Sequence, residues 1–100
     1  MHPNALLELA AELIAAVNKL DAPADATVSA FFRHHKNLGQ RERASIAETV
    51  YAMLRERLKF QNLAQSGSGP VARRLAILAW RGSPTFLRGA LSPQEQLWLD

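Results

Sequence analysis

The basic side chains between residues 33 and 59 are the group in this sequence whose types and spacing could do chemistry. Arg33 and Lys36 precede a predicted turn between two helices and Arg41 follows it, while Arg55 and Lys59 come later on the outer side of the second helix. Guanidinium forks pair with phosphate oxygens, and each neutralised phosphate adds affinity that falls with rising salt. These residues therefore indicate an anionic partner, for which nucleic acid is the usual candidate. With two arginines of a later helix, the candidate RNA contacts are Arg33, Lys36, Arg41, Arg55, Lys59, Arg73 and Arg74.

The distribution of charge along the chain favours the same kind of partner. The formal net charge of the 100 residues is +3. Residues 1–25 hold four acidic side chains against one lysine, a net charge of −3, whereas residues 26–94 hold eleven basic side chains against three acidic ones, a net charge of +8. A basic body after an acidic first segment favours an anionic partner. A basic solvated surface with no partner is the other interpretation that the charge allows.

No arrangement typical of an enzyme site is found in the sequence. His34 and His35 are adjacent, so on a helix they point about 100° apart and cannot hold one metal ion together. Glu8 and Glu12 lie on the polar side of the first predicted helix, and no convincing pair of carboxylates for acid–base chemistry is present. The chain has no cysteine, which removes thiolate ligands and thiolate nucleophiles. We expect no catalytic residue, no metal and no cofactor in this chain, and we expect His35 to be a packed side chain on the apolar stripe of its helix.

Apolar residues recur at helical spacing along the chain, and no alternating strand pattern interrupts them. The length is that of one domain, so residues 1–100 are expected to form a single compact all-α bundle. No apolar run approaches the roughly 18 residues that a membrane span needs, and no secretory signal is visible, so a cytoplasmic protein is expected. About five to six helices are predicted: Asn4–Leu20, Ala24–Leu38, Gln40–Leu63, one that starts at Pro70 and stops at Gly82, a short helical turn that Ser83 opens and Gly89 ends, and one that begins at the capping box Ser92-Pro93-Gln94-Glu95.

The predicted helix of residues 40–63 is the longest and has two faces. Its apolar positions fall in one arc of the helical wheel, and Arg41, Arg55 and Lys59 fall on the opposite side. Gly39 is expected to end the preceding helix in the left-handed conformation. The aromatic side chains are expected to be buried, so recognition of RNA backbone and shape is favoured over base reading. The predicted core seam is Ile46, Val50, Met53, Leu54 and Leu58, and the predicted core aromatics are Phe31, Phe32, Phe60 and Trp80.

Residues 92–100 combine a strong helix start with a short remaining length. The apolar residues Leu97, Trp98 and Leu99 follow the capping box. Such an apolar group would be poorly placed in a frayed tail. We therefore expect that the chain stops inside or just after a helix and that a further domain follows Asp100. The alternative is that Leu97–Leu99 form a docking surface for a neighbouring domain.

Residues 38–55 resemble the signature helix of NusB-like helical domains. In those domains an acidic residue and an arginine open a helix, and an acidic residue, Val-Tyr, a small residue and Leu-Arg follow. The corresponding residues here are Glu42-Arg43, Glu48, Val50-Tyr51, Ala52 and Leu54-Arg55. The family often has glycine at the position of Ala52. Together with Asp21–Asp25, Phe31-Phe32 and Leu63–Pro70, this segment is similar to the N-terminal domain of the RsmB/Fmu-type RNA cytosine-5 methyltransferases of bacteria.

The resemblance implies a NusB-like bundle that docks small-subunit ribosomal RNA for a catalytic domain further along the parent protein. That domain would use S-adenosylmethionine and two cysteines. This chain has no cysteine and no glycine-rich cofactor turn, so no catalytic or cofactor-binding residue is transferred to it. The implied partners are ribosomal RNA and the protein's own C-terminal catalytic domain. Antitermination factors of the same fold bind RNA and a ribosomal protein, so a protein-interaction module is an alternative, and a structural cap on the catalytic domain is a third.

Overall fold

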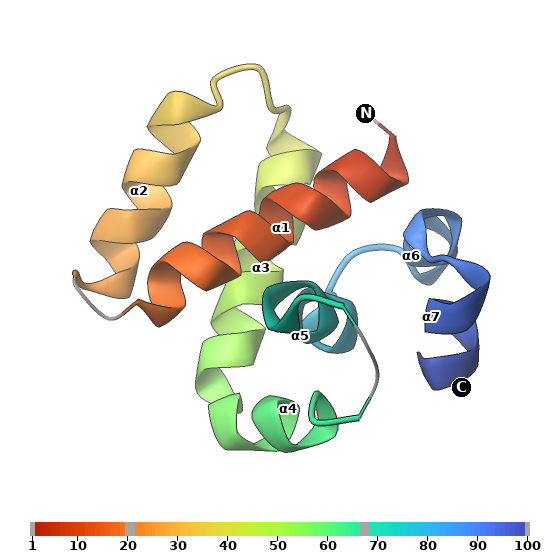
Figure 1. The fold of residues 1–100 in the computed structure, drawn as a ribbon. Coiled ribbons are helices and arrows are strands. Elements are labelled where there is room, and N and C mark those ends of the chain that lie inside the picture. Colours follow the sequence, from red (N-terminus) through yellow and green to blue (C-terminus); the bar gives the residue numbers. More distant parts are fainter. Residues whose placement is uncertain (1, 20–21, 67–68, 100) are drawn as a thin grey trace.

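Seven α-helices and no β-strand make up the computed structural model over the residues that it describes, 2–19, 22–66 and 69–99 (Figure 1). They form a compact globule with a radius of gyration of 12.8 Å. The predicted all-α class is confirmed, and the number of helices exceeds the five to six expected. None of the described helices has the length and apolar character that crossing a bilayer requires. The helices are α1 Pro3–Asn18, α2 Ala24–His34, α3 Gln40–Arg55, α4 Arg57–Leu63, α5 Val71–Ala79, α6 Pro84–Ala90 and α7 Pro93–Leu99.

Helix α1 lies at the centre of the bundle and packs against α2, α3, α5 and α6 (Figure 1). Its apolar residues recur every three to four positions, which places Leu7, Leu13 and Ile14 on its inner side at 0–1% exposure. Burial of each such side chain stabilises the fold by about 1.5–3 kcal/mol. The α1 core residues therefore hold the other helices in place around it.

The ends of α1 follow from local chemistry. Pro3 stands in the first turn, where its missing N–H costs no hydrogen bond. The Nδ1 atom of His2 accepts a hydrogen bond from the backbone N–H of Asn4 at 3.1 Å and so caps the helix. The helix ends at Asn18, before its predicted end at Leu20, which lies outside the described residues.

The connection between α2 and α3 differs from the prediction. Helix α2 ends at His34 instead of continuing to Leu38, and His35 follows with a φ of −121°. Gly39 has a φ of −75° and is the N-cap of α3, so its assignment as a left-handed helix end is wrong. Its N–H donates to Oε1 of Glu42 at 2.7 Å. Leu38 is only 3% exposed, because it reaches the core from the connection, and this explains the apolar signal beyond the end of α2.

The predicted helix of residues 40–63 is two helices, α3 and α4, which meet at Glu56. The backbone of Glu56 has φ −122° and ψ 43°, outside the helical region. The break leaves Leu58 78% exposed, so its assignment to the core seam is wrong, and Phe60, at 5%, is the residue that α4 buries. No glycine or proline marks this break, and packing of α4 against α5 overrides the local helix propensity. Along α3 the seam is confirmed at Ile46, Val50 and Met53, each 0% exposed, with Leu54 half-buried.

The later helices begin at the predicted residue or one residue after it, but they end differently. Pro70 is the N-cap of α5, not its first residue, and α5 ends at Ala79, three residues before Gly82. The Ser83 hydroxyl caps α6 as expected. Helix α6 then continues through Gly89 to Ala90, so Gly89 does not end it. Phe86 lies in the first turn of α6, directly after the connection from α5.

Helix α7 begins at the predicted capping box. The backbone N–H of Ser92 donates to Oε1 of Glu95 at 2.9 Å, and the backbone N–H of Glu95 donates to Oγ of Ser92 at 3.2 Å. No residue of α7 is fully buried. Its attachment to the bundle therefore depends on a few side-chain contacts described below.

Candidate nucleic-acid interface

Arg33, Lys36 and Arg41 lie around the connection between α2 and α3, and together they are called the basic turn. Arg33 is in the last turn of α2, Lys36 follows the helix, and Arg41 is in the first turn of α3. All three side chains are exposed, and none forms an ion pair with another described residue. A cation in the last turn of a helix also interacts favourably with the helix dipole. The basic turn thus presents cationic groups to solvent.

A hydrogen bond between Tyr51 and Asp25 links the start of α2 to the later part of α3. The Tyr51 hydroxyl donates to Oδ1 of Asp25 at 2.7 Å. This bond, with smaller effects from burial and from the Asp25 charge, raises the pKa of Tyr51 above its usual value of 10.0. Tyr51 belongs to the signature segment of the sequence, and its contact shows a structural role for that position.

Arg55 is the last residue of α3, at the opposite end from the basic turn, and Lys59 lies in α4. From Arg41 to Arg55 the helix rises by roughly 21 Å. Both side chains are exposed. The Lys59 ammonium is 3.8 Å from a carboxylate oxygen of Glu56 and 5.5 Å from the ring centre of Phe60. The five basic candidates of residues 33–59 therefore form two groups at the two ends of α3, not one patch.

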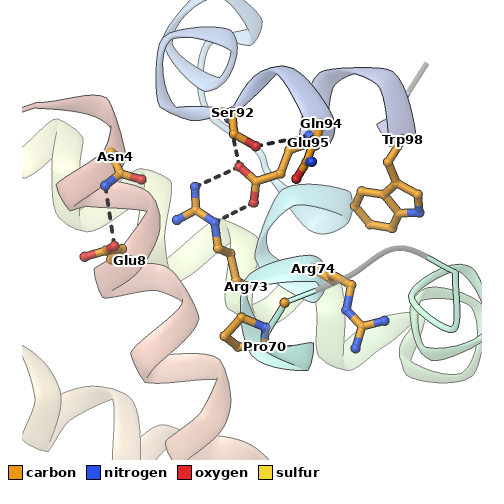
Figure 2. A pocket seen from close by; sticks show the side chains of 10 residues that line it. Asn4, Glu8, Pro70, Arg73, Arg74, Ser92, Gln94, Glu95 and Trp98 are labelled. Carbon is orange, nitrogen blue, oxygen red and sulfur yellow. Dashed lines mark hydrogen bonds and ion pairs between the residues drawn. The ribbon is translucent and has the colours of Figure 1, made fainter.

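Arg73 makes intramolecular contacts in a depression of about 700 Å³ lined by residues of α1, α5 and α7 (Figure 2). Its Nε donates to Oε2 of Glu95 at 2.6 Å, and its Nη2 donates to Oε1 of Glu95 and to the carbonyl of Ala90, both at 3.1 Å. This two-pronged pairing lowers the pKa of Glu95 and raises that of Arg73. The side chain of Arg73 is only 18% exposed, so its guanidinium joins α5 to α7.

Arg74 is held by backbone oxygens near the end of α4. Its Nη1 donates to the carbonyls of Ala64 and Ser66. The hydroxyl of Ser66 in turn accepts from the indole N–H of Trp98 at 2.7 Å. Figure 2 shows the Arg74 side chain directed away from the Arg73–Glu95 pair. Arg73 and Arg74 thus link elements of the bundle, and any contact that they make with RNA stays a prediction.

The histidines have different surroundings. The ring of His35 lies 4.3 Å from that of Phe31, centre to centre, at an angle of 36°, and the side chain is half-buried. His34 is exposed at the end of α2. In the described part of the chain, no group of His, Asp and Glu side chains is placed to hold a metal ion.

Trp80, which was predicted to lie in the core, forms an aromatic pair with Phe86. The rings of Trp80 and Phe86 lie parallel within 4°, with centres 6.3 Å apart, and both residues are half-buried. They border a depression of about 490 Å³, called the aromatic depression, which Arg41 also lines. The signal for it is the segment from Trp80 to Phe86, where a helix end and turn residues separate two aromatics. The full lining is Leu6, Arg41, Glu42, Ala44, Ser45, Glu48, Trp80, Ser83 and Phe86.

Comparisons with known protein families, with curated proteins and with solved structures found no match to this chain.

Proposed function

We propose that this chain is a NusB-like RNA-docking domain of an S-adenosylmethionine-dependent ribosomal RNA cytosine-5 methyltransferase. The observation that carries the proposal is the basic turn, where Arg33, Lys36 and Arg41 are exposed together beside the helix that has the NusB-like signature. Exposed guanidinium and ammonium groups attract the phosphate backbone and release its counterions.

In the proposed parent protein, this chain would bind RNA and a separate domain would carry out the methyl transfer. The chain has no cysteine, so the nucleophile and the S-adenosylmethionine site are assigned to a catalytic domain beyond residue 100. This chain would capture ribosomal RNA by charge and hold it by shape. Its contribution to methylation is therefore to the affinity for RNA, not to the chemical step.

A salt titration tests this function. We expect the chain to bind a hairpin of small-subunit ribosomal RNA at low salt, with an affinity that falls steeply as salt rises. Replacing the basic turn by Arg33→Gln, Lys36→Gln and Arg41→Gln should weaken binding and reduce the slope of log affinity against log salt by about 2. Lys19→Gln, an exposed change at the cap residue that follows α1, is the control. Absence of binding at low salt, or binding that salt does not weaken, would rule out the RNA role.

The exposed apolar residues of α7 favour a second candidate, a docking surface for protein. Leu97 is 78% exposed and Leu99 is 38% exposed, although both follow a well-formed capping box. Large exposed apolar side chains near one another are typical of interaction sites. The partner that fits this candidate is the catalytic domain of the same protein, which places the chain as an interaction module or a structural cap.

A binding experiment separates the two candidates. The catalytic domain of the parent protein, added as a separate chain, should bind through α7, and Leu97→Asp should weaken that binding at least tenfold while leaving the affinity for RNA unchanged. The basic-turn variant should show the reverse pattern. If Leu97→Asp leaves the affinity for the catalytic domain unchanged, α7 is not its docking surface.

A further inference from the structure

We propose that the aromatic depression binds one unpaired nucleobase of the RNA, which stacks on the Trp80–Phe86 pair while Arg41 holds the adjoining phosphate. The proposal rests on the RNA-docking function and adds a base-binding site to it. Its central observation is that Arg41 belongs both to the basic turn and to the lining of the aromatic depression. An RNA backbone held at the basic turn would therefore pass directly over the aromatic rings.

The aromatic pair is held in place before any ligand binds. The indole N–H of Trp80 donates to the carbonyl of Ser83 at 3.4 Å. Gly82 lies so close to the indole that a Cβ at this position would be 2.8 Å from three of its ring atoms. Arg81 lies between Trp80 and Gly82, and its backbone N–H donates a hydrogen bond to the Thr49 hydroxyl oxygen. A stacking surface fixed in this way loses little entropy when a base lies on it.

The polar groups of the depression suit a base better than a second phosphate. Glu48 and Ser45 line it from α3. The Glu48 carboxylate accepts hydrogen bonds and repels phosphate, so it would pair with an exocyclic amino group, as carboxylates do with cytosine. Glu42 is already bonded to the N–H of Gly39. This arrangement favours cytosine and adenine over uracil, which has no amino group.

Size and accessibility favour a single-stranded segment. The volume of about 490 Å³ lies within the range of 300–1,000 Å³ that is usual for small-molecule sites. Bases in a duplex have both faces covered, whereas loops and bulges present unstacked bases that can lie on aromatic side chains. Stacking of one base on an aromatic side chain changes affinity by about five- to hundredfold when the side chain is removed.

Tryptophan fluorescence tests the proposal. The chain has two tryptophans, so Trp98→Phe leaves Trp80 as the only indole. In this variant we expect a hexamer of cytidylate or adenylate to quench Trp80 emission in a saturable way, and a hexamer of uridylate or a duplex RNA to do so at least fivefold more weakly. Phe86→Leu, made in the same background, should weaken binding of the cytidylate hexamer about tenfold.

Two further variants separate a lost site from a lost fold. Gly82→Ala should displace the indole and reduce affinity, with thermal unfolding followed to confirm that the bundle remains. Leu58→Ala, an exposed change on α4, should leave affinity unchanged. If the ribosomal RNA hairpin binds with salt dependence while Trp80 emission and the Phe86→Leu affinity stay unchanged, the base site is wrong and the RNA-docking function stands. If no RNA binds, the base site and the RNA-docking function are both wrong. If Trp80 emission is quenched only by a peptide of apolar and basic residues, the depression is a protein-binding site instead.

Discussion

The hydroxyl oxygen of Thr49 accepts a hydrogen bond from the backbone N–H of Arg81 at 3.0 Å. Thr49 is 0% exposed and is the one polar residue in the described core. The bond joins the middle of α3 to the connection between α5 and α6. Because Arg81 directly follows Trp80, this part-buried contact also holds the backbone next to the Trp80 ring.

Thr49→Val should therefore destabilise the fold and disturb the aromatic pair. The replacement keeps the side-chain shape but leaves a part-buried N–H without its acceptor, which costs about 1 kcal/mol of the free energy of unfolding. Urea denaturation measures the loss, and Trp80 fluorescence in a Trp98→Phe background measures the disturbance. Thr49→Ser keeps the acceptor and should lose less. Equal stability of the valine variant and the original protein would show that the bond contributes nothing.

The Arg73–Glu95 pair should make the attachment of α7 dependent on pH. Because the pairing with Arg73 lowers the pKa of Glu95 below 4.5, its stabilisation is fully present above that value and is lost as pH falls through the lowered pKa. Glu95→Gln should reduce stability at neutral pH by about 1.5–3 kcal/mol. The difference between the two proteins should shrink in acid. Chemical denaturation at pH 7 and pH 3 checks this, and a constant difference would contradict it.

Tyr51 should have the opposite dependence at high pH. Its pKa is raised, so the stabilisation from its bond to Asp25 is present below pH 10 and is lost as pH rises through the raised pKa. Tyr51→Phe should cost about 0.5–1 kcal/mol near neutral pH, because the bond lies near the surface. Tyr51 is the only tyrosine in the chain, so its absorbance titration reports this group alone. A titration at the ordinary tyrosine pKa would show that the bond does not persist in solution.

The break between α3 and α4 predicts different tolerances for two apolar residues. Ile46→Ala, at 0% exposure, should destabilise the fold by about 2–5 kcal/mol because it leaves a cavity. Leu58→Gln, at 78% exposure, should change stability by less than about 0.5 kcal/mol. Thermal unfolding of both variants measures the contrast. A large loss in Leu58→Gln would mean that residues 40–63 form one continuous helix with Leu58 inside.

The sequence was sufficient for the helical class and for much of the core. The spacing of apolar residues predicted α1 and the buried side of α3, because a 3.6-residue period directly reports which side faces the core. The capping box at Ser92 and Glu95 predicted the start of α7, because both of its hydrogen bonds join residues that are close in the chain. Signals of this kind depend only on near neighbours in the chain.

What the sequence could not give depends on contacts between distant segments. Nothing near Glu56 marks a break, because the packing of α4 against α5 imposes it. The pairing of Arg73 with Glu95 spans 22 residues, so an arginine that belongs to an internal ion pair looks the same in the sequence as one that is free for a ligand. Likewise, Trp80 was predicted to lie in the core, but it is half-buried beside Phe86 and Arg41, a position that follows from three elements meeting.

The central place of α1 has a consequence for how the protein folds during synthesis. Its partners α5 and α6 are made some 50 to 70 residues later. The apolar side of α1, with Leu7, Leu13 and Ile14, is therefore synthesised long before α5 and α6 can cover it. Contacts between distant segments slow folding, and a nascent chain with an exposed apolar helix is prone to aggregation. Helix α1 is thus fully covered only after α5 and α6 have been made.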